Sequence, residues 1–292
     1  MIINPAVFLA ALFAVVIFGG SAVATKMAVS AINPVDVSIL RTIIGGLIAL
    51  VLAATLRIRL PSEPLQKRLL VLSGFCGFIV FPLLFTLGVG LTSANHATMI
   101  LAILPVLTGA IAMGWDRQKP AMLWWLGCGI AFAGELLLLY DPGADTASAT
   151  LTGDLLVWLS TFFASLGYVA GGRLQRSGYS ARGTTFWGVS LFALLLLPVA
   201  PFVIDFNSLS IAGGFAWSGL LYQAIGVTIF AYILWYWALG TGGIARVGLF
   251  QFLQPVSGVI LAWLILSEQL SLFFIVASMI IMLGVVIAFR AR

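Results

Sequence analysis

Ten stretches of about 20 mainly apolar residues recur along the chain of 292 residues. A stretch of this length can cross the hydrocarbon core of a bilayer as one α-helix. In lipid, every backbone N–H and C=O group needs a partner within its own segment, and the runs lack the alternation of a membrane β-strand. We therefore expect helices at about residues 5–27, 35–56, 69–90, 93–115, 122–140, 151–172, 184–204, 214–239, 243–266 and 270–290.

Composition agrees with a membrane protein and excludes a soluble fold. Hydrophobic residues make up 62% of the chain and charged residues 8%, which leaves too few polar side chains to cover a water-soluble globule of this size. The predicted fold class is an all-α integral membrane protein with ten transmembrane helices. We expect the first run to be a helix of the mature protein rather than a removable signal, because no basic residue precedes it.

The sequence pattern indicates that a unit of five helices occurs twice in the chain. A shift of 150 positions places Pro105 on Pro255 and Gly134 on Gly284. Because five is an odd number, the second copy would cross the membrane in the opposite sense, as in the inverted repeats of secondary transporters. We predict a first repeat at residues 1–140, a polar external linker at 141–150 and a second, inverted repeat at 151–292.

Basic residues lie between alternate runs, and the remaining loops carry acidic residues instead. By the positive-inside rule, this distribution places both termini in the cytoplasm. It also accounts for the net charge of +5 without a nucleic-acid partner, which we do not expect. The basic loop residues are Arg57, Arg59, Lys67, Arg68, Arg117, Lys119, Arg173, Arg176 and Arg182.

The fourth helix of each repeat has a proline near its middle. Such a proline frees the carbonyl group four residues earlier and weakens the helix at that point. We interpret Pro105 and Pro255 as paired hinges for a rocking motion, although kinks without motion would give the same pattern. Ser21 and His96 are predicted to lie near the mouth of the cavity and to act in gating; His96 could equally be an ordinary interfacial histidine.

Aromatic residues are concentrated in the third helix of each repeat. Thr228, Tyr232 and Trp235 stand at i, i+4 and i+7 and therefore share one helix face. The shift of 150 positions relates this face to the one that carries Phe78 and Phe85. We expect a cavity wall here, with an interfacial aromatic belt as the alternative.

Few polar groups lie within the apolar runs. The amides of Gln251 and Gln254 each need a ligand, water or another helix as partner, since a buried unpaired amide costs about 1–3 kcal/mol. Arg41 follows Asp36 by five residues, so both a structural ion pair and a cation facing the cavity fit the sequence. A nucleotide-binding loop, a metal cluster and a nucleophilic motif are all absent from the sequence, so we expect no cofactor, no metal and no catalysis.

The chain resembles the EamA-type transporters of the drug/metabolite transporter superfamily. The matching features are FGGSAVATK at residues 18–26, Arg41, the run from Ala238 to Glu268 and the matched glycine in the last helix of each repeat. The resemblance implies a ten-helix exporter of a small metabolite that works by alternating access in the bacterial inner membrane. Within the superfamily, the chain is most similar to exporters of aromatic and other neutral amino acids.

The substrate site is predicted between the two repeats, near the middle of the bilayer. The substrate and the bilayer are the expected partners, and the protein could be a monomer or a homodimer. Another solute (a nucleoside, a sugar or a drug-like compound), a membrane enzyme and a structural or receptor protein are the alternatives, and proton antiport and facilitated diffusion fit equally well. The predicted substrate-binding residues are Phe78, Phe85, Met99, Trp158, Phe162, Thr228, Tyr232, Trp235, Gln251 and Gln254.

Overall fold

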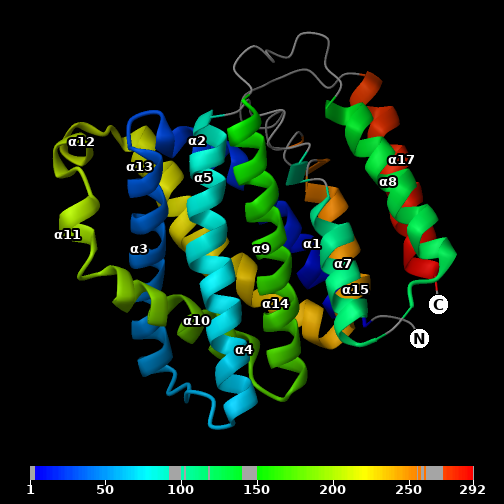
Figure 1. Ribbon diagram of the computed structural model, residues 1–292, viewed down its shortest axis with the longest axis horizontal. Coiled ribbons are helices and arrows are strands. Elements are labelled where there is room, and N and C mark those ends of the chain that lie inside the picture. The colour runs from blue at the N-terminus through cyan, green and yellow to red at the C-terminus, as the bar shows by residue number, and fades with distance from the viewer. Residues whose placement is uncertain are drawn as a thin grey trace.

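The computed structural model describes residues 4–91, 100–101, 103–117, 119–139, 150–254, 256–257, 260 and 272–291. All regular elements within these ranges are helices, as Figure 1 shows. The first half contains α1 (Pro5–Gly19), α2 (Ser21–Val29), α3 (Pro34–Thr55), α4 (Pro64–Phe75), α5 (Phe81–Leu91), α7 (Leu104–Trp115) and α8 (Met122–Leu139). The second half contains α9 (Leu151–Arg176), α10 (Ala181–Leu196), α11 (Ala200–Val203), α12 (Phe206–Ile211), α13 (Gly214–Leu221), α14 (Tyr232–Gly242), α15 (Ile244–Val247) and α17 (Leu272–Arg290).

Five helical segments are long and apolar enough to cross a membrane: Pro5–Val29, Pro34–Thr55, Pro64–Leu91, Leu151–Arg176 and Gly214–Gly242. Five shorter apolar helices accompany them, at Leu104–Trp115, Met122–Gly134, Ala181–Leu196, Ile244–Leu253 and Ile275–Arg290. The predicted all-α fold is thus confirmed for the residues that the structure describes. The count of ten transmembrane helices stays a prediction.

Two of the long segments contain a wide, π-helical turn in their middle. The first lies at Cys76–Val80 between α4 and α5, and the second at Tyr222–Ala231 between α13 and α14. In the second turn, the Thr228 hydroxyl donates to the carbonyl oxygen of Gln223, five residues earlier, at 2.8 Å. A π-helical turn inserts an extra residue and rotates the following side chains, and such turns are frequent at functional sites. Both aromatic segments of the sequence therefore carry the same irregularity.

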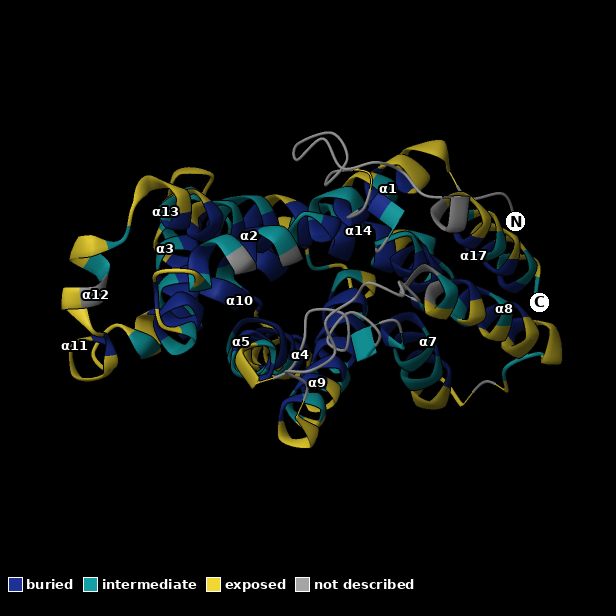
Figure 2. Ribbon diagram, turned by 90° about the horizontal axis from the view of Figure 1, so that it is seen from above, coloured by how far each residue is buried: buried dark blue, intermediate teal, exposed yellow. Residues whose placement is uncertain are grey.

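The helices α8 and α17 pack against each other along one edge of the molecule, at the right of Figure 1. Their contact depends on glycines that allow the two backbones to approach closely. A Cβ atom on Gly127 would overlap the backbone of Ala288, and one on Gly284 would overlap the backbone of Ala131. Small residues are the usual means of close helix packing in membranes. Seen from above in Figure 2, buried residues face the helix interfaces and exposed ones lie around the periphery.

The loops that carry basic residues lie at one end of the molecule, the lower end of Figure 1, and both termini lie toward the same end. We call this the basic end. The Tyr179 hydroxyl donates to the carbonyl oxygen of Arg59 at 2.8 Å, and Gln66 Nε2 donates to that of Ser177 at 3.1 Å. Burial raises the pKa of Tyr179 to about 12, so its hydroxyl remains a donor at neutral pH. These bonds join the α3–α4 loop region to the α9–α10 loop.

Candidate functional site

A small cavity lies between the two halves of the chain. Its volume is about 40 Å³, which exceeds the roughly 10–15 Å³ that one water molecule needs but is far below the roughly 300–1,000 Å³ of a typical ligand pocket. A substrate larger than a few waters therefore requires the surrounding helices to move apart. The lining residues are Phe18, Ser21, Arg41, Phe81, Phe85, Leu101, Leu104, Tyr168, Val227, Tyr232 and Gln254.

Arg41 is the one cation in the described lining of this cavity. Arg41 is only 5% exposed, and its Nε donates to the Thr228 hydroxyl oxygen at 3.0 Å. The terminal nitrogen Nη2 is buried and has no hydrogen-bond partner in the part of the chain that the structure describes. Asp36 does not neutralise it: among the described residues no carboxylate forms an ion pair with Arg41, and Asp36 Oδ2 accepts from the backbone N–H of Asp205 at 3.2 Å. Of the two interpretations of Arg41, the structure therefore favours the cation that faces the cavity.

Thr228 holds the guanidinium in place. Its oxygen accepts from Arg41 Nε, while its own hydroxyl proton goes to the carbonyl oxygen of Gln223. The wide turn at Tyr222–Ala231 brings the Gln223 carbonyl within reach of this hydroxyl, because in a regular α-helix a threonine hydroxyl bonds to the carbonyl three or four residues earlier rather than five. The local irregularity of the backbone thus aligns the hydroxyl that orients the buried cation.

An aromatic cluster surrounds the remaining sides of the cavity. The Tyr232 ring lies 4.7 Å from Phe78, 5.6 Å from Phe18 and 5.8 Å from Tyr168, measured between ring centroids. Trp235 packs behind this cluster with no exposed surface, at 5.8 Å from Tyr168. Phe18 and Phe78 come from the first half of the chain, and the other three rings from the second. The cluster therefore joins both halves around one apolar space.

Several predicted binding residues come together here. Phe85, Tyr232 and Gln254 line the cavity, as does Ser21, the predicted gate residue. Ser21 Oγ donates to Gln223 Oε1 at 3.1 Å. Phe78, Thr228 and Trp235 lie directly behind the lining through the contacts described above.

Trp158 and Phe162 do not line the cavity, contrary to the expectation from their aromatic character. Their rings stack on each other at 6.5 Å, and Trp158 is 47% exposed. The inward face of α9 carries Thr161, Ser165 and Tyr168 instead, at i, i+4 and i+7. A tryptophan ring is equally compatible with lipid and with a cavity wall, so its residue type does not distinguish the two positions.

The remaining predicted residues have different placements. Gln251 is 2% exposed, and neither its amide oxygen nor its amide nitrogen has a hydrogen-bond partner within the described ranges, but it does not line the described cavity. It lies in a tight, 3₁₀-helical segment at Gly248–Leu253. Pro105 is buried in the first turn of α7. Met99, His96 and Pro255 lie outside the described residues.

The predicted substrate-binding set did not include Arg41, Phe18 or Tyr168, although Arg41 was considered as a cation that faces the cavity. Arg41 had a detectable signal, since a charge nearly two turns inside a transmembrane helix usually faces protein or water. Phe18 and Tyr168 had none, because only the packing of helices shows which rings meet.

Comparisons with known proteins decide the family. The sequence matches the EamA-like transporter family over residues 5–140 and again over residues 151–290. The chain belongs to the EamA-like transporter family. The resemblance seen in the sequence is thereby confirmed, and the family is matched twice, once in each half of the chain.

Other EamA-type proteins match over nearly their whole length. The chain is 30% identical to the uncharacterized transporter YdeK of Bacillus subtilis (strain 168) over 276 residues, which cover 94% of each protein. It is 25% identical to an uncharacterized transporter of Archaeoglobus fulgidus, covering 95% of this chain and 96% of that one. A crystal structure with 18% identity superposes with a TM-score of 0.78 over 98% of this chain and 99% of the other, which shows a shared fold. This EamA protein is therefore a multi-pass membrane transporter with a small-molecule substrate.

The two halves of this EamA transporter are also connected at the basic end by charge. Asp116, directly after α7, forms an ion pair with Arg173 of α9 and lies 3.7 Å from Arg176 Nη1. The Arg173 guanidinium lies over the Trp115 ring, 4.7 Å from its centroid. These contacts hold the ends of α7 and α9 together, and we call this connection the closure of the basic end.

Replacing Asp116 by asparagine is expected to loosen this closure. The side chains are 20–30% exposed in the Asp116–Arg173 pair, so solvent screening limits the effect to about 2–5-fold. The measurement is the rate at which a cysteine at Met113 reacts with a water-soluble maleimide, with Cys76 and Cys128 replaced by serine. Glu63→Gln is the matched control, because Glu63 is an exposed acid at the same end. Equal rates in both variants would contradict a closing role for Asp116.

Proposed function

We propose that this EamA transporter exports aromatic and other large neutral amino acids. The observation that carries the proposal is a buried guanidinium that has no carboxylate partner among the described residues and lies beside an aromatic wall. A neutral amino acid offers one carboxylate for the cation and one apolar side chain for the rings. Arg41 would bind the carboxylate through its fork of N–H groups, and rings such as Tyr232 and Phe85 would contact the side chain.

The proposed mechanism is alternating access between the two halves. Residues from both halves line the cavity, and its present volume is too small for an amino acid, so access requires the halves to separate on one side at a time. Separation at the basic end would break the Asp116–Arg173 ion pair. Pro105 and Pro255 remain the proposed hinges, and His96 and Ser21 the proposed gate residues.

The proposed arrangement in the cell is the bacterial inner membrane, with ten helices in two inverted repeats at residues 1–140 and 151–292. Both termini would be cytoplasmic, because they lie toward the same end as the basic loops. The substrate-binding set proposed from the sequence is retained for Phe78, Phe85, Thr228, Tyr232 and Gln254, to which we add Arg41.

The test is flux through the purified protein in sealed liposomes, with empty liposomes as the blank. Labelled phenylalanine, tryptophan, methionine and threonine are compared, each with and without a pH gradient. We expect saturable, stereoselective flux that is faster for the aromatic substrates, and the response to the gradient separates proton antiport from facilitated diffusion. Absence of flux for all four, with folded and inserted protein, would overturn the amino-acid proposal and direct the search to nucleosides, sugars or drug-like compounds.

A further inference from the structure

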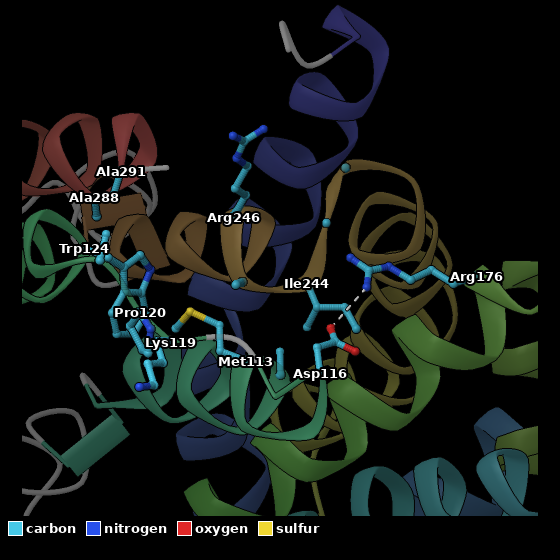
Figure 3. A pocket seen from close by; sticks show the side chains of 15 residues that line it. Met113, Asp116, Lys119, Pro120, Trp124, Arg176, Ile244, Arg246, Ala288 and Ala291 are labelled. Carbon is cyan, nitrogen blue, oxygen red and sulfur yellow. Dashed lines mark ion pairs between the residues drawn. The ribbon is translucent and has the colours of Figure 1, made fainter.

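A second, larger pocket lies at the basic end, between the α8/α17 pair and the rest of the molecule. Its volume is about 360 Å³, and it is separate from the central cavity because the two share no lining residue. Its walls come from the end of α7, the start of α8, the α14–α15 junction and the end of α17. Figure 3 shows the side chains around it.

The rim of this pocket is positively charged. Lys119, Arg176 and Arg246 stand at different sides of the opening in Figure 3, and Asp116 is the only acid among the described lining residues. Asp116 is already engaged by Arg173 and Arg176. The side chains of Lys119 and Arg246 form no ion pair with any described residue; the Arg246 guanidinium lies 5.9 Å from the centroid of the Phe289 ring. Lys119 and Arg246 are therefore available to bind an anion in this pocket.

Two further features of the wall suit the same ligand. Trp124 lines the pocket and is 5% exposed, and its buried indole Nε1 has no hydrogen-bond partner among the residues that the structure describes. The helix α8 begins at Met122, and Pro120 and Ala121 just before it line the pocket, so the positive end of the helix dipole lies there. Below the rim, Met113 and Ile244 give the pocket an apolar floor.

We propose that this pocket binds the phosphate group of an anionic phospholipid from the leaflet at the basic end. Lys119 and Arg246 would bind the phosphate oxygens, and Trp124 Nε1 would donate to one of them. The apolar floor would contact the start of the acyl chains. A basic rim over an apolar floor between helices, at the level of the lipid headgroups, matches the two parts of a phospholipid. A free phosphate ion has the same charge but no apolar part to occupy the floor.

Because the lipid would lie between the α8/α17 pair and α7, it would stabilise the attachment of this pair to the molecule. The lipid site does not depend on which substrate is transported, so a test of lipid binding is independent of a test of amino-acid export.

The test compares melting temperatures of the purified protein in a neutral detergent with phosphatidylglycerol, phosphatidylcholine or inorganic phosphate added. We expect phosphatidylglycerol to raise the melting temperature with saturation, and the other two to have little effect. In the double variant Lys119→Gln/Arg246→Gln, apparent phosphatidylglycerol binding should weaken about tenfold or more, as expected for two lost cationic contacts. Trp124→Phe, which keeps a ring but loses the N–H group, should weaken it less.

The matched control is Lys67→Gln/Arg68→Gln, which removes the same charge from exposed positions near the start of α4, at the basic end. This variant should keep the response to phosphatidylglycerol. Equal weakening in both double variants would show a nonspecific charge effect and overturn the proposal. An equal response to inorganic phosphate and phosphatidylglycerol would overturn the lipid assignment in favour of a soluble phosphate. A melting temperature measured without lipid identifies any variant that fails to fold, and mass spectrometry of lipid retained by the intact wild-type protein gives a second reading.

Discussion

Replacing Arg41 by glutamine is expected to reduce transport by about 10–100-fold while leaving the protein at least as stable as the wild type. The reduction follows from the loss of charge-assisted hydrogen bonds to a substrate carboxylate, each worth about 1.5–3 kcal/mol. The unchanged or higher stability follows because Arg41 is buried without an ion-pair partner among the described residues. If the role of Arg41 were purely structural, the variant would show the opposite pattern. Its stability would fall, and transport would fall only in proportion to the loss of folded protein.

The measurement is initial flux per folded molecule in liposomes, together with the melting temperature in detergent. Arg41→Lys keeps the charge but loses the fork of N–H groups, so we expect an intermediate rate. Arg68→Gln, at an exposed position, should transport like the wild type. Phenylethylamine, which has the aromatic ring and a positive charge but no carboxylate, provides a substrate-side control: its flux should not fall in Arg41→Gln, because the variant removes a like charge and no carboxylate contact. Normal amino-acid flux in Arg41→Gln would exclude the proposed role.

Replacing Gly127 by valine is expected to remove most of the folded protein. The added Cβ would overlap the backbone of Ala288, and a backbone cannot move aside as a flexible side chain can. Forcing such overlap costs at least about 1–3 kcal/mol, and it separates α8 from α17 where no hydrophobic effect drives the helices together in lipid. The measurement is the monodisperse fraction and melting temperature of the detergent-solubilised protein.

Gly129 provides a matched control in the same helix. It lies two residues away, is exposed, and has no atom within 4 Å of its added Cβ. Gly129→Val should therefore leave the folded fraction and the melting temperature close to those of the wild type. If both variants lose folding equally, the cause is the helix propensity of valine or insertion into the membrane, and the close approach of α8 and α17 is not responsible.

The chemistry of the site could be predicted in part. Tyr232 and Phe85 were found because a helical face repeats at a known period, and Gln254 because an amide within an apolar run needs a polar partner; all three line the cavity. Thr228 was also predicted, but its role in orienting Arg41 was not. The wide turn at Tyr222–Ala231 changes which carbonyl oxygen accepts the hydrogen bond from its hydroxyl. No residue pattern in the sequence marks a π-helical turn, because the extra residue is stabilised by packing against other helices.

The position of Trp158 and Phe162 outside the described cavity has a physical cause. Lipid and the interior of a membrane protein are both apolar, so hydrophobicity separates inside from outside poorly in such a chain. Small and hydroxylated residues mark the packed side of α9 instead, as Thr161 and Ser165 show. Aromatic residues on a transmembrane helix are thus a weaker guide to a cavity than the small polar residues opposite them.

The sequence by itself determined that this chain is an all-α membrane protein with a repeated design, because helix length, hydrophobicity and the spacing of the repeats are local properties. Only the tertiary structure decided which groups meet. Arg41 joins Thr228 across 187 positions, Asp116 joins Arg173 across 57, and the phospholipid pocket draws its wall from residues between 112 and 291. Such contacts depend on how the helices pack, and packing of apolar surfaces in an apolar solvent is set by shape and by a few polar pairs rather than by hydrophobic pattern.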